Sequence, residues 1–548
     1  MSASHKKQLR KEQNAAQMTE KQMAEQKEAK KLRLYSIIFT AAIALMICVV
    51  IFTTVTNSGI IERNTTAVTV DGTKVSAVEL NYYYIDSVNN YLNQWGDYIS
   101  LSGLDSTKAL DEQMYNADEE ITWADYFLES ATNNIHSVYA IYNKAAAEGY
   151  TLTEEDNASI ETMISNMELY GTLYYGYPDL DSYLTGMYGT CANEKTYRAY
   201  AEVQYIASAY ANDYNETLTY TDEDIAAVLA EEPKAYNFYS YNYYYLSADK
   251  FLEGGVENED GTKTYSDEEK AAALAACEEA ANSLIAENIT DLVLLDKAIG
   301  NLAINAEVEN AASIAVDNRQ YTQLSSVLQD WVTDDARVEG DLAVVPYESE
   351  PTNEDGTTTT TVNGYYVVFF KGMDDNTYKM NNVRHILVAF EGGTTTDGTT
   401  TYSDEEKAAA KAEAEEILAA YLAGEQTEEA FTALTHEHTD DVDSNGHPNN
   451  DGLYENIIPS SSYVENFLNW AIDDARTPGE TGIVETEYGY HVMYFVGDSE
   501  ETYRDTMITS ELRSEALTEW ENSLIEGSTM DVQNTSKVKT DLKLSSGN

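Results

Sequence analysis

GYHVMYF, residues 489–495, recurs in this chain as GYYVVFF, residues 364–370. Both stretches begin with glycine and continue with aromatic and β-branched residues, which is typical of a buried β-strand. The third position is His491 in one copy and Tyr366 in the other. Because histidine is the side chain that gains or loses a proton near neutral pH, we expect the two copies to share a fold and to differ in chemistry.

The similarity continues through the residues that precede each strand. TYSDEEKAAA occurs at residues 264–273 and again at residues 401–410, each time with a Ser and, three residues later, a Glu. This spacing predicts a capping box at the start of a helix. Further on, WVTDDAR at residues 331–337 matches WAIDDAR at residues 470–476. Each copy reads as strand, acidic loop, helix, irregular loop, helix and strand.

This repetition predicts an α+β fold class with two tandem units, residues 236–375 and 376–499, each a small antiparallel sheet covered by helices. Aligning the first strands places His385 opposite Tyr243, so both strand histidines of the second unit are tyrosines in the first. A single histidine in an apolar strand is usually a core residue. The pair formed by His385 and His491 is what points to a site.

An uncharged run, LYSIIFTAAIALMICVVIFTTV at residues 34–55, is long enough as a helix to cross a hydrocarbon core about 30 Å thick. Residues 1–33 before it hold nine Lys or Arg and four Glu. By the positive-inside rule they form a cytoplasmic basic tail, and everything after residue 56 lies outside. We therefore expect a single N-terminal transmembrane helix in the cell membrane.

The chain is strongly acidic, with 95 Asp and Glu against 33 Lys and Arg in 548 residues. Its formal charge of −62 becomes −67 when the +5 of the basic tail is set aside. Such a surface repels polyanions, which argues against nucleic acid as a partner and against phosphate-bearing substrates. Beyond the apolar run only Cys191 and Cys277 remain, so no disulfide framework is expected, although a single bridge between them stays open.

Residues 66–235 begin with a hairpin pattern, VTVDGTKV, and continue with helical periodicity. Tyrosines are concentrated in MELYGTLYYGYPDLDSYLTGMYGT at residues 167–190. Because tyrosine combines a large apolar face with a polar tip, these side chains form either the core of a helical domain or a peptide-binding surface.

Five motifs of the second unit, VRHILV, LAGEQTEEAFTAL, THEHTDD, NNDGLYEN and PGETGIVETEYGYHVMYF, resemble the parvulin-type peptidyl-prolyl isomerases in order and spacing. The resemblance implies an isomerase domain at residues 376–499 and a degenerate parvulin-like domain without an active site at residues 236–375. The anchor and the opening VTVDGTKVSAVEL resemble the membrane-anchored or exported parvulin foldases of bacteria. They imply a mainly helical, chaperone-like domain at residues 66–235, completed by residues 500–548.

The same resemblance implies the site residues and the reaction. The catalytic residues would be His385, Asp441, Thr486 and His491, and the proline pocket would be formed by Leu453, Val464 and Phe467. The reaction is cis–trans isomerisation of X–Pro bonds, which needs neither a cofactor nor a metal because no bond is broken. The expected partners are unfolded or nascent exported proteins. A Gram-positive-type bacterium is the expected source, and the sequence does not give an oligomeric state.

Other interpretations of these residues stay open. The chain could be a binding-only holdase or scaffold in which both strand histidines are inert. DVDSNG at residues 441–446 matches the start of a calcium loop, although Gly452 stands where a bidentate Glu belongs. HEH at residues 436–438, with Asp440 and His447, is a second candidate, for zinc. Motifs of P-loop enzymes, α/β-hydrolases and HExxH metalloproteases are missing from the sequence.

Overall fold

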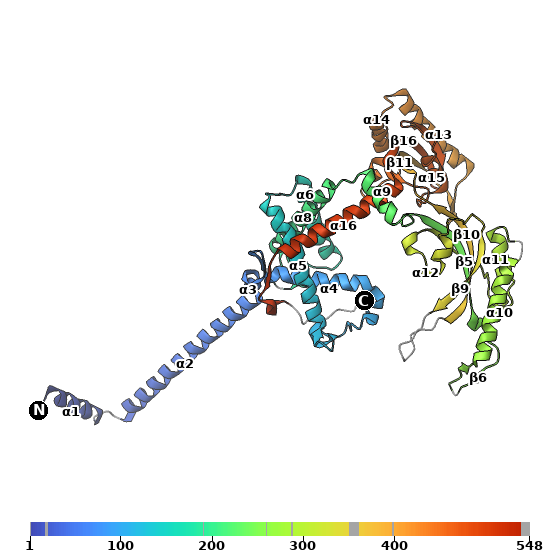
Figure 1. Cartoon of the computed structure of the whole chain (residues 1–548). Coiled ribbons are helices and arrows are strands. Elements are labelled where there is room, and N and C mark those ends of the chain that lie inside the picture. The colour runs from blue at the N-terminus through green and yellow to red at the C-terminus, as the bar shows by residue number, and fades with distance from the viewer. Residues whose placement is uncertain are drawn as a thin grey trace. The chain divides into compact units, whose positions relative to one another are not determined.

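The computed structural model of the chain describes residues 2–16, 20–189, 191–258, 260–286, 289–349, 361–396 and 399–538. Parts of five predicted ranges, 1–33, 66–235, 236–375, 376–499 and 500–548, therefore lie outside the described residues. The chain forms two compact units (Figure 1): unit 1 comprises residues 1–218 and 513–548, and unit 2 comprises residues 219–512.

The predicted membrane segment lies in one long helix. After α1 (Ala3–Ala16), helix α2 (Glu20–Asn57) contains a span, Met23–Val55, that is long and apolar enough to cross a membrane. It is the one such helix in the part of the chain that the structure describes. The helix starts earlier than the predicted residues 34–55 because the charged tail before them is also helical.

Unit 1 is mainly helical around one small sheet. Its helices are α3 (Ile60–Asn64), α4 (Ala77–Trp95), α5 (Trp123–Ala147), α6 (Glu154–Leu173), α7 (Leu180–Tyr188) and α8 (Glu194–Thr217), with the later part of α16 (Tyr503–Gly527). Its main sheet has the order β17 (Met530–Val532), β1 (Thr66–Val70), β2 (Thr73–Ser76), and a two-stranded ribbon joins β3 (Met114–Asn116) to β4 (Ile121–Thr122). Val68 pairs with Val532, so a strand near the C-terminal end completes the sheet that opens the unit.

Tyrosines of unit 1 occupy both environments that the sequence left open. On α4, Tyr82, Tyr83 and Tyr84 are no more than 1% exposed and belong to the core of the unit. By contrast, Tyr174 and Tyr175, just after α6, are 78% and 60% exposed. Core filling therefore explains the first group and does not explain the second.

Unit 2 contains two four-stranded antiparallel sheets, which we call the first and the second sheet. The first has the order β8 (Ile314–Gln320), β5 (Phe238–Ser247), β10 (Thr361–Asp374), β9 (Leu342–Ser349), with α10 (Asp267–Ala286), α11 (Leu292–Gly300), α12 (Ser326–Val332) and a hairpin of β6 (Val256–Glu257) and β7 (Lys263–Thr264). The second has the order β14 (Leu453–Ile457), β11 (Lys379–Ala389), β16 (Gly489–Thr502), β15 (Thr481–Glu485), with α13 (Asp404–Ala423), α14 (Glu428–His438), α15 (Glu465–Ala471) and a hairpin of β12 (Thr394–Thr396) and β13 (Thr399–Thr401).

The strands of the two sheets follow the same order. In each sheet the first and last strands in the chain pair at the centre, the second strand lies at the edge beside the first, and the third lies at the other edge beside the last. The predicted first and last strands are present. Each sheet also has two strands that were not predicted, β8 and β9 in the first sheet and β14 and β15 in the second. The capping boxes are confirmed: the Ser403 hydroxyl accepts from the backbone N–H of Glu406, and the Ser266 hydroxyl accepts likewise from Glu269.

Strand register also matches between the sheets. His385 pairs with Met493, and Tyr243 pairs with Val368, as the alignment of the two copies requires. A cation–π contact repeats as well: Arg476 lies 4.2 Å from the Trp470 ring centroid and Arg337 lies 4.6 Å from that of Trp331. These features are what a duplication would produce, while a parvulin origin for the first sheet stays a prediction.

The boundaries of the compact units differ from the predicted ones. Helix α9 (Asp222–Glu231) and the first part of α16 share a small cluster in unit 2, in which Ile225, Tyr236 and Ile508 are buried. The sequence had placed α9 in the helical domain because its periodicity continues that of the preceding helices. Cys191 and Cys277 are both buried, and no disulfide is present among the described residues, so the bridge that the sequence left open is not formed there.

Candidate active site

The two strand histidines of the second sheet meet above its face. His385 on β11 and His491 on β16 project to the same side, since they pair with Met493 and Leu387 on neighbouring antiparallel strands. Their Nδ1 atoms are 2.9 Å apart, and the rings stack with centroids 5.1 Å apart. Both side chains are buried, at 4% and 5% exposure. The predicted pairing of the histidines is therefore present in the structure.

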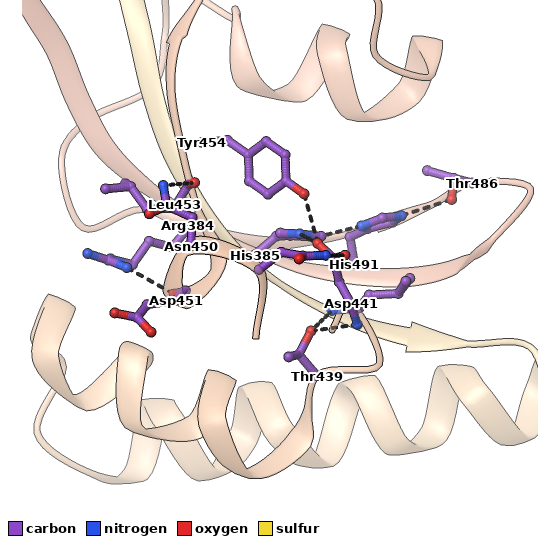
Figure 2. A network of polar contacts seen from close by, with 12 residues as sticks. Arg384, His385, Thr439, Asp441, Asn450, Asp451, Leu453, Tyr454, Thr486 and His491 are labelled. Atoms are coloured by element: carbon purple, nitrogen blue, oxygen red, sulfur yellow. Dashed lines mark hydrogen bonds and ion pairs between the residues drawn. The ribbon is translucent and has the colours of Figure 1, made fainter. Parts of the chain in front are cut away.

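Asp441 lies beside the pair because the chain passes over β11 directly after α14. Its Oδ2 atom is 3.0 Å from Nε2 of His385 and accepts a hydrogen bond from the Tyr454 hydroxyl at 2.8 Å (Figure 2). The side-chain amide of Asn449 donates to Oδ1 at 2.6 Å. The hydrogen bond from His385, followed by those from Asn449 and Tyr454, holds the pKa of Asp441 well below its ordinary value. This lowered pKa favours the ionised form of Asp441 at neutral pH.

Thr486 ends the network on the other side. Its Oγ1 is 2.9 Å from Nε2 of His491 and accepts the backbone N–H of Tyr488 at 3.2 Å. Figure 2 shows Thr486, His491, His385, Asp441 and Tyr454 joined in one series of hydrogen bonds. The structure thus brings together all four residues predicted as catalytic.

The proton positions in this series follow from the charge on Asp441. An ionised carboxylate only accepts, so Nε2 of His385 donates to it. The bond between the two Nδ1 atoms contains one proton, which either ring can supply. If His491 supplies this proton, Nε2 of His491 accepts a hydrogen bond from the Thr486 hydroxyl. If His385 supplies it, the His385 ring is protonated on both nitrogens, and Nε2–H of His491 donates to Thr486. The hydrogen bonds are complete in both patterns, with His491 neutral.

A neutral His491 agrees with its surroundings. Burial, with a further contribution from neighbouring His385, lowers the pKa of His491 to about 3. The unfolded chain takes up this proton at about pH 6.5, whereas the folded chain does not until about pH 3, so acid stabilises the unfolded state. Asp441 acts in the same direction at lower pH, because its folded pKa is lowered too.

We therefore predict that replacing His491 by Gln makes unit 2 less sensitive to acid. Relative to the variant, the wild-type chain should lose on the order of 3 kcal/mol of unfolding free energy between pH 7 and pH 4. Scanning calorimetry of the full chain and of the variant measures this difference, and the many surface carboxylates cancel because both proteins carry them. Equal losses in the two proteins would contradict a buried, neutral His491.

A pocket of about 350 Å³ opens above the histidines. Phe467 on α15 is the largest apolar contact, with its ring centroid 5.5 Å from those of both His385 and His491. Val464 also lines the pocket, as predicted. The remaining lining residues are Leu387, Asp441, Tyr454, Ser462, Tyr463 and Tyr488. Such a cavity, apolar on one side and polar on its floor, fits a small apolar ring joined to an amide.

Leu453 is the one predicted pocket residue that the structure does not bring to the pocket. It pairs with Arg384, whereas Tyr454 pairs with Val383. Because neighbouring strand residues point to opposite faces, Tyr454 shares the face of His385 and Leu453 does not. In the motif NNDGLYEN the residue that lines the pocket is therefore Tyr454, one position after the predicted Leu453.

The calcium and zinc alternatives can be compared with the geometry. Asp443 accepts the backbone N–H groups of Asn445 and His447, as in a polar turn. His436 contacts Asp451 at 3.0 Å, and Asp451 is not part of the turn that contains Asp443. Among the described residues no group of three or more His, Cys, Asp or Glu is placed to hold a metal ion.

The family model of the rotamase or PPIC-type PPIase domain matches residues 385–497, which include both histidines, Asp441 and Thr486. No curated protein matches the chain.

Several solved structures are similar over part of the chain. The peptidylprolyl isomerase PrsA from Bacillus anthracis is 19% identical, with 28% of this chain and 59% of that chain covered and a TM-score of 0.17. PrsA from Bacillus subtilis is 14% identical, with 77% and 90% covered and a TM-score of 0.25. A SurA-like chaperone structure from Campylobacter jejuni, described with PEB4 and Cj1289, is 19% identical, with 27% and 51% covered and a TM-score of 0.15. The chain spans 59% of the length of the first of these structures.

Proposed function

We propose, from the premise that residues 385–497 are a peptidyl-prolyl cis–trans isomerase domain of the PPIC, or parvulin, type, that the whole chain is a membrane-anchored foldase acting outside the membrane. It isomerises X–Pro bonds in exported proteins, and unit 1 holds unfolded clients as a chaperone. The observation that carries the proposal is the hydrogen-bonded series from Thr486 to Asp441 beneath an apolar pocket.

The reaction requires a site that favours a twisted amide. Rotation about an X–Pro bond crosses a barrier of about 18–20 kcal/mol, which arises from amide resonance. In the twisted state the nitrogen regains its lone pair and the carbonyl loses conjugation, so a site that binds this state better than the planar ones lowers the barrier. Only interactions that change during the rotation contribute to the rate.

The geometry assigns a role to each residue. Phe467 and Val464 would hold the proline ring while the preceding residue turns, because they form the apolar wall of the pocket. His385 and His491 form a rigid polar floor, since each ring is fixed by hydrogen bonds on both nitrogens. The carboxylate of Asp441, with 21% of its side chain exposed, faces the pocket and places a negative charge near the rotating carbonyl. Thr486 is hydrogen-bonded to Nε2 of His491 and holds that ring in place.

The experiment uses the full chain in detergent and a client whose slow refolding phase is an X–Pro isomerisation. We expect the chain to accelerate that phase and to suppress aggregation of the client. The variant His385→Ala, His491→Ala should lose the acceleration and keep the suppression, because the second activity is assigned to unit 1. If neither protein accelerates refolding while both suppress aggregation, the chain is a holdase and the isomerase proposal is wrong.

Tyr454 was not predicted from the sequence, and its contact with Asp441 gives a separate expectation. Tyr454→Phe keeps the ring and removes one donor to the carboxylate, so kcat should fall about 3- to 10-fold with KM unchanged. The pKa of Asp441 should rise, which moves the acid limb of the pH–rate profile to higher pH. Tyr463→Phe is the matched control because it lines the same pocket and leaves that donor in place. Equal kinetics in the two variants would contradict this role for Tyr454.

A further inference from the structure

Unit 1 carries an exposed apolar patch at the end of α6, away in sequence from the residues of the isomerase site. We call it the tyrosine patch, and it consists of Leu169 (55% exposed), Tyr170 (56%), Leu173 (77%), Tyr174 (78%) and Tyr175 (60%). Large apolar side chains scattered singly over a surface are ordinary, but five within seven residues form a contiguous exposed surface that calls for an explanation.

The patch continues into a groove along α6, which Tyr183 of α7 borders. A cavity of about 660 Å³ lies there, lined by Met163, Met167, Tyr170 and Tyr183 among others. The rings are already ordered: Tyr170 stacks on Tyr174 with centroids 5.2 Å apart, and Tyr175 stacks on Tyr183 at 6.0 Å.

Gly171 allows the two helices to approach at this groove. A Cβ atom at Gly171 would come within 2.6 Å of the Tyr183 ring, so the absence of a side chain there lets α7 pack closely against α6. The wall of the groove is therefore built by packing rather than by mobile side chains.

The sequence around the patch is acidic. Residues 145–194 contain nine Asp or Glu and neither Lys nor Arg. Glu155 lines the groove and Glu168 adjoins the exposed tyrosines in sequence. Arg198, the cation that contacts α6, already pairs with Glu161 at 2.5 Å and with Glu194 at 3.2 Å. A partner for this surface therefore has to bring its own positive charge.

We propose that the tyrosine patch binds extended segments of unfolded chain in which apolar side chains alternate with Lys or Arg. Tyrosine rings offer apolar faces at low conformational cost and attract cations over those faces, while the surrounding carboxylates attract the same cations. A second copy of this acidic chain and an anionic bilayer surface are repelled by the same charges. The inference rests on the proposed chaperone role and names its client class.

The test measures fluorescence anisotropy of two labelled, unstructured 12-residue peptides with the full chain in detergent. Both peptides have the same apolar residues, and one carries four Lys where the other carries four Glu. We expect the Lys peptide to bind at least about tenfold more tightly at low salt, and the difference to shrink at high salt. The triple variant Tyr170→Ser, Tyr174→Ser, Tyr175→Ser should lose at least about tenfold in affinity for the Lys peptide.

Two controls make the result specific. Tyr98→Ser, Leu101→Ser removes exposed apolar side chains elsewhere in unit 1, 69% and 76% exposed, and should leave binding unchanged. Glu155→Gln, Glu168→Gln should weaken binding of the Lys peptide and strengthen that of the Glu peptide. All variants should keep wild-type isomerisation rates, so loss of peptide binding is distinguishable from failure of the proposed catalysis.

Three outcomes would overturn the inference. The first is equal affinity for the two peptides, and the second is unchanged binding of the Lys peptide by the triple variant. The third is that the triple substitution alters only the sedimentation of the chain or its binding to anionic vesicles, which would show that a second copy or a bilayer covers the patch.

Discussion

The double substitution His385→Tyr, His491→Tyr is expected to lower kcat/KM for X–Pro isomerisation at least about 100-fold. It replaces the two imidazoles on the floor of the pocket with phenol rings. The carboxylate of Asp441 then loses its imidazole partner, and the proline ring of the substrate loses the imidazole surface beneath it. A protease-free assay of cis-to-trans exchange in a short X–Pro peptide, with the full chain in detergent, measures this effect.

The first sheet is the reason for choosing tyrosine. Tyr243 and Tyr366 stand at the register positions of the two histidines, and their rings meet edge to face with centroids 5.7 Å apart. This fold thus accommodates two tyrosines at these positions, and we expect thermal unfolding of the variant to remain cooperative. A folded variant with more than about a tenth of wild-type kcat/KM would contradict the role of the imidazoles.

Truncating Phe467 has the second largest expected effect. Phe467 is 4% exposed and contacts both histidines, so Phe467→Ala should raise KM about 10-fold or more by removing the apolar wall that holds proline. The same change should cost about 3 kcal/mol of stability, because a buried ring leaves a cavity.

Phe431→Ala is the matched control for that variant. Phe431 is fully buried on the opposite face of the second sheet, packed against Tyr421 and Tyr494. Its truncation should cost similar stability while leaving KM near the wild-type value. If the two variants raise KM equally, the effect comes from a loosened fold and not from the proline pocket.

Much of the site could be predicted from the sequence. His385 and His491 lie on strands whose pattern is plain, Thr486 directly follows one, and Thr486 and His491, five residues apart, are in contact at 2.9 Å. The repeat also predicted that His385 and His491 correspond to Tyr243 and Tyr366, and the strand registers of the two sheets agree with that alignment. In a regular strand the backbone geometry fixes the direction in which each side chain points.

The pocket rim could not be predicted in the same way. Asn450 and Asp451 have left-handed backbone angles, with φ of 45° and 51°, and Gly452 follows with φ of 74°. A Cβ atom at Gly452 would lie 2.5 Å from the carbonyl oxygen of His385, so this turn depends on a residue without a side chain. The turn decides that Tyr454 and not Leu453 faces the histidines, and residue types alone did not reveal its conformation.

The arrangement of unit 1 was predictable only in outline. The sequence indicated helices and a terminal segment that belongs with them, and β17 indeed pairs with β1 across more than four hundred residues of chain. Sequence periodicity does not determine which tyrosines are buried, because this depends on packing. Tyr83 and Tyr174 both lie in tyrosine-rich stretches, yet Tyr83 is buried and Tyr174 is exposed.

The central claim is that the hydrogen-bonded histidines of the second sheet catalyse X–Pro isomerisation. The most direct measurement is NMR exchange spectroscopy of one X–Pro peptide at equilibrium, with catalytic amounts of the full wild-type chain or of His385→Tyr, His491→Tyr. The account predicts that cis–trans exchange, which takes tens of seconds or more unaided, becomes faster in proportion to the wild-type concentration and stays at the unaided rate with the variant. Equal acceleration by both proteins, or by neither, would contradict it.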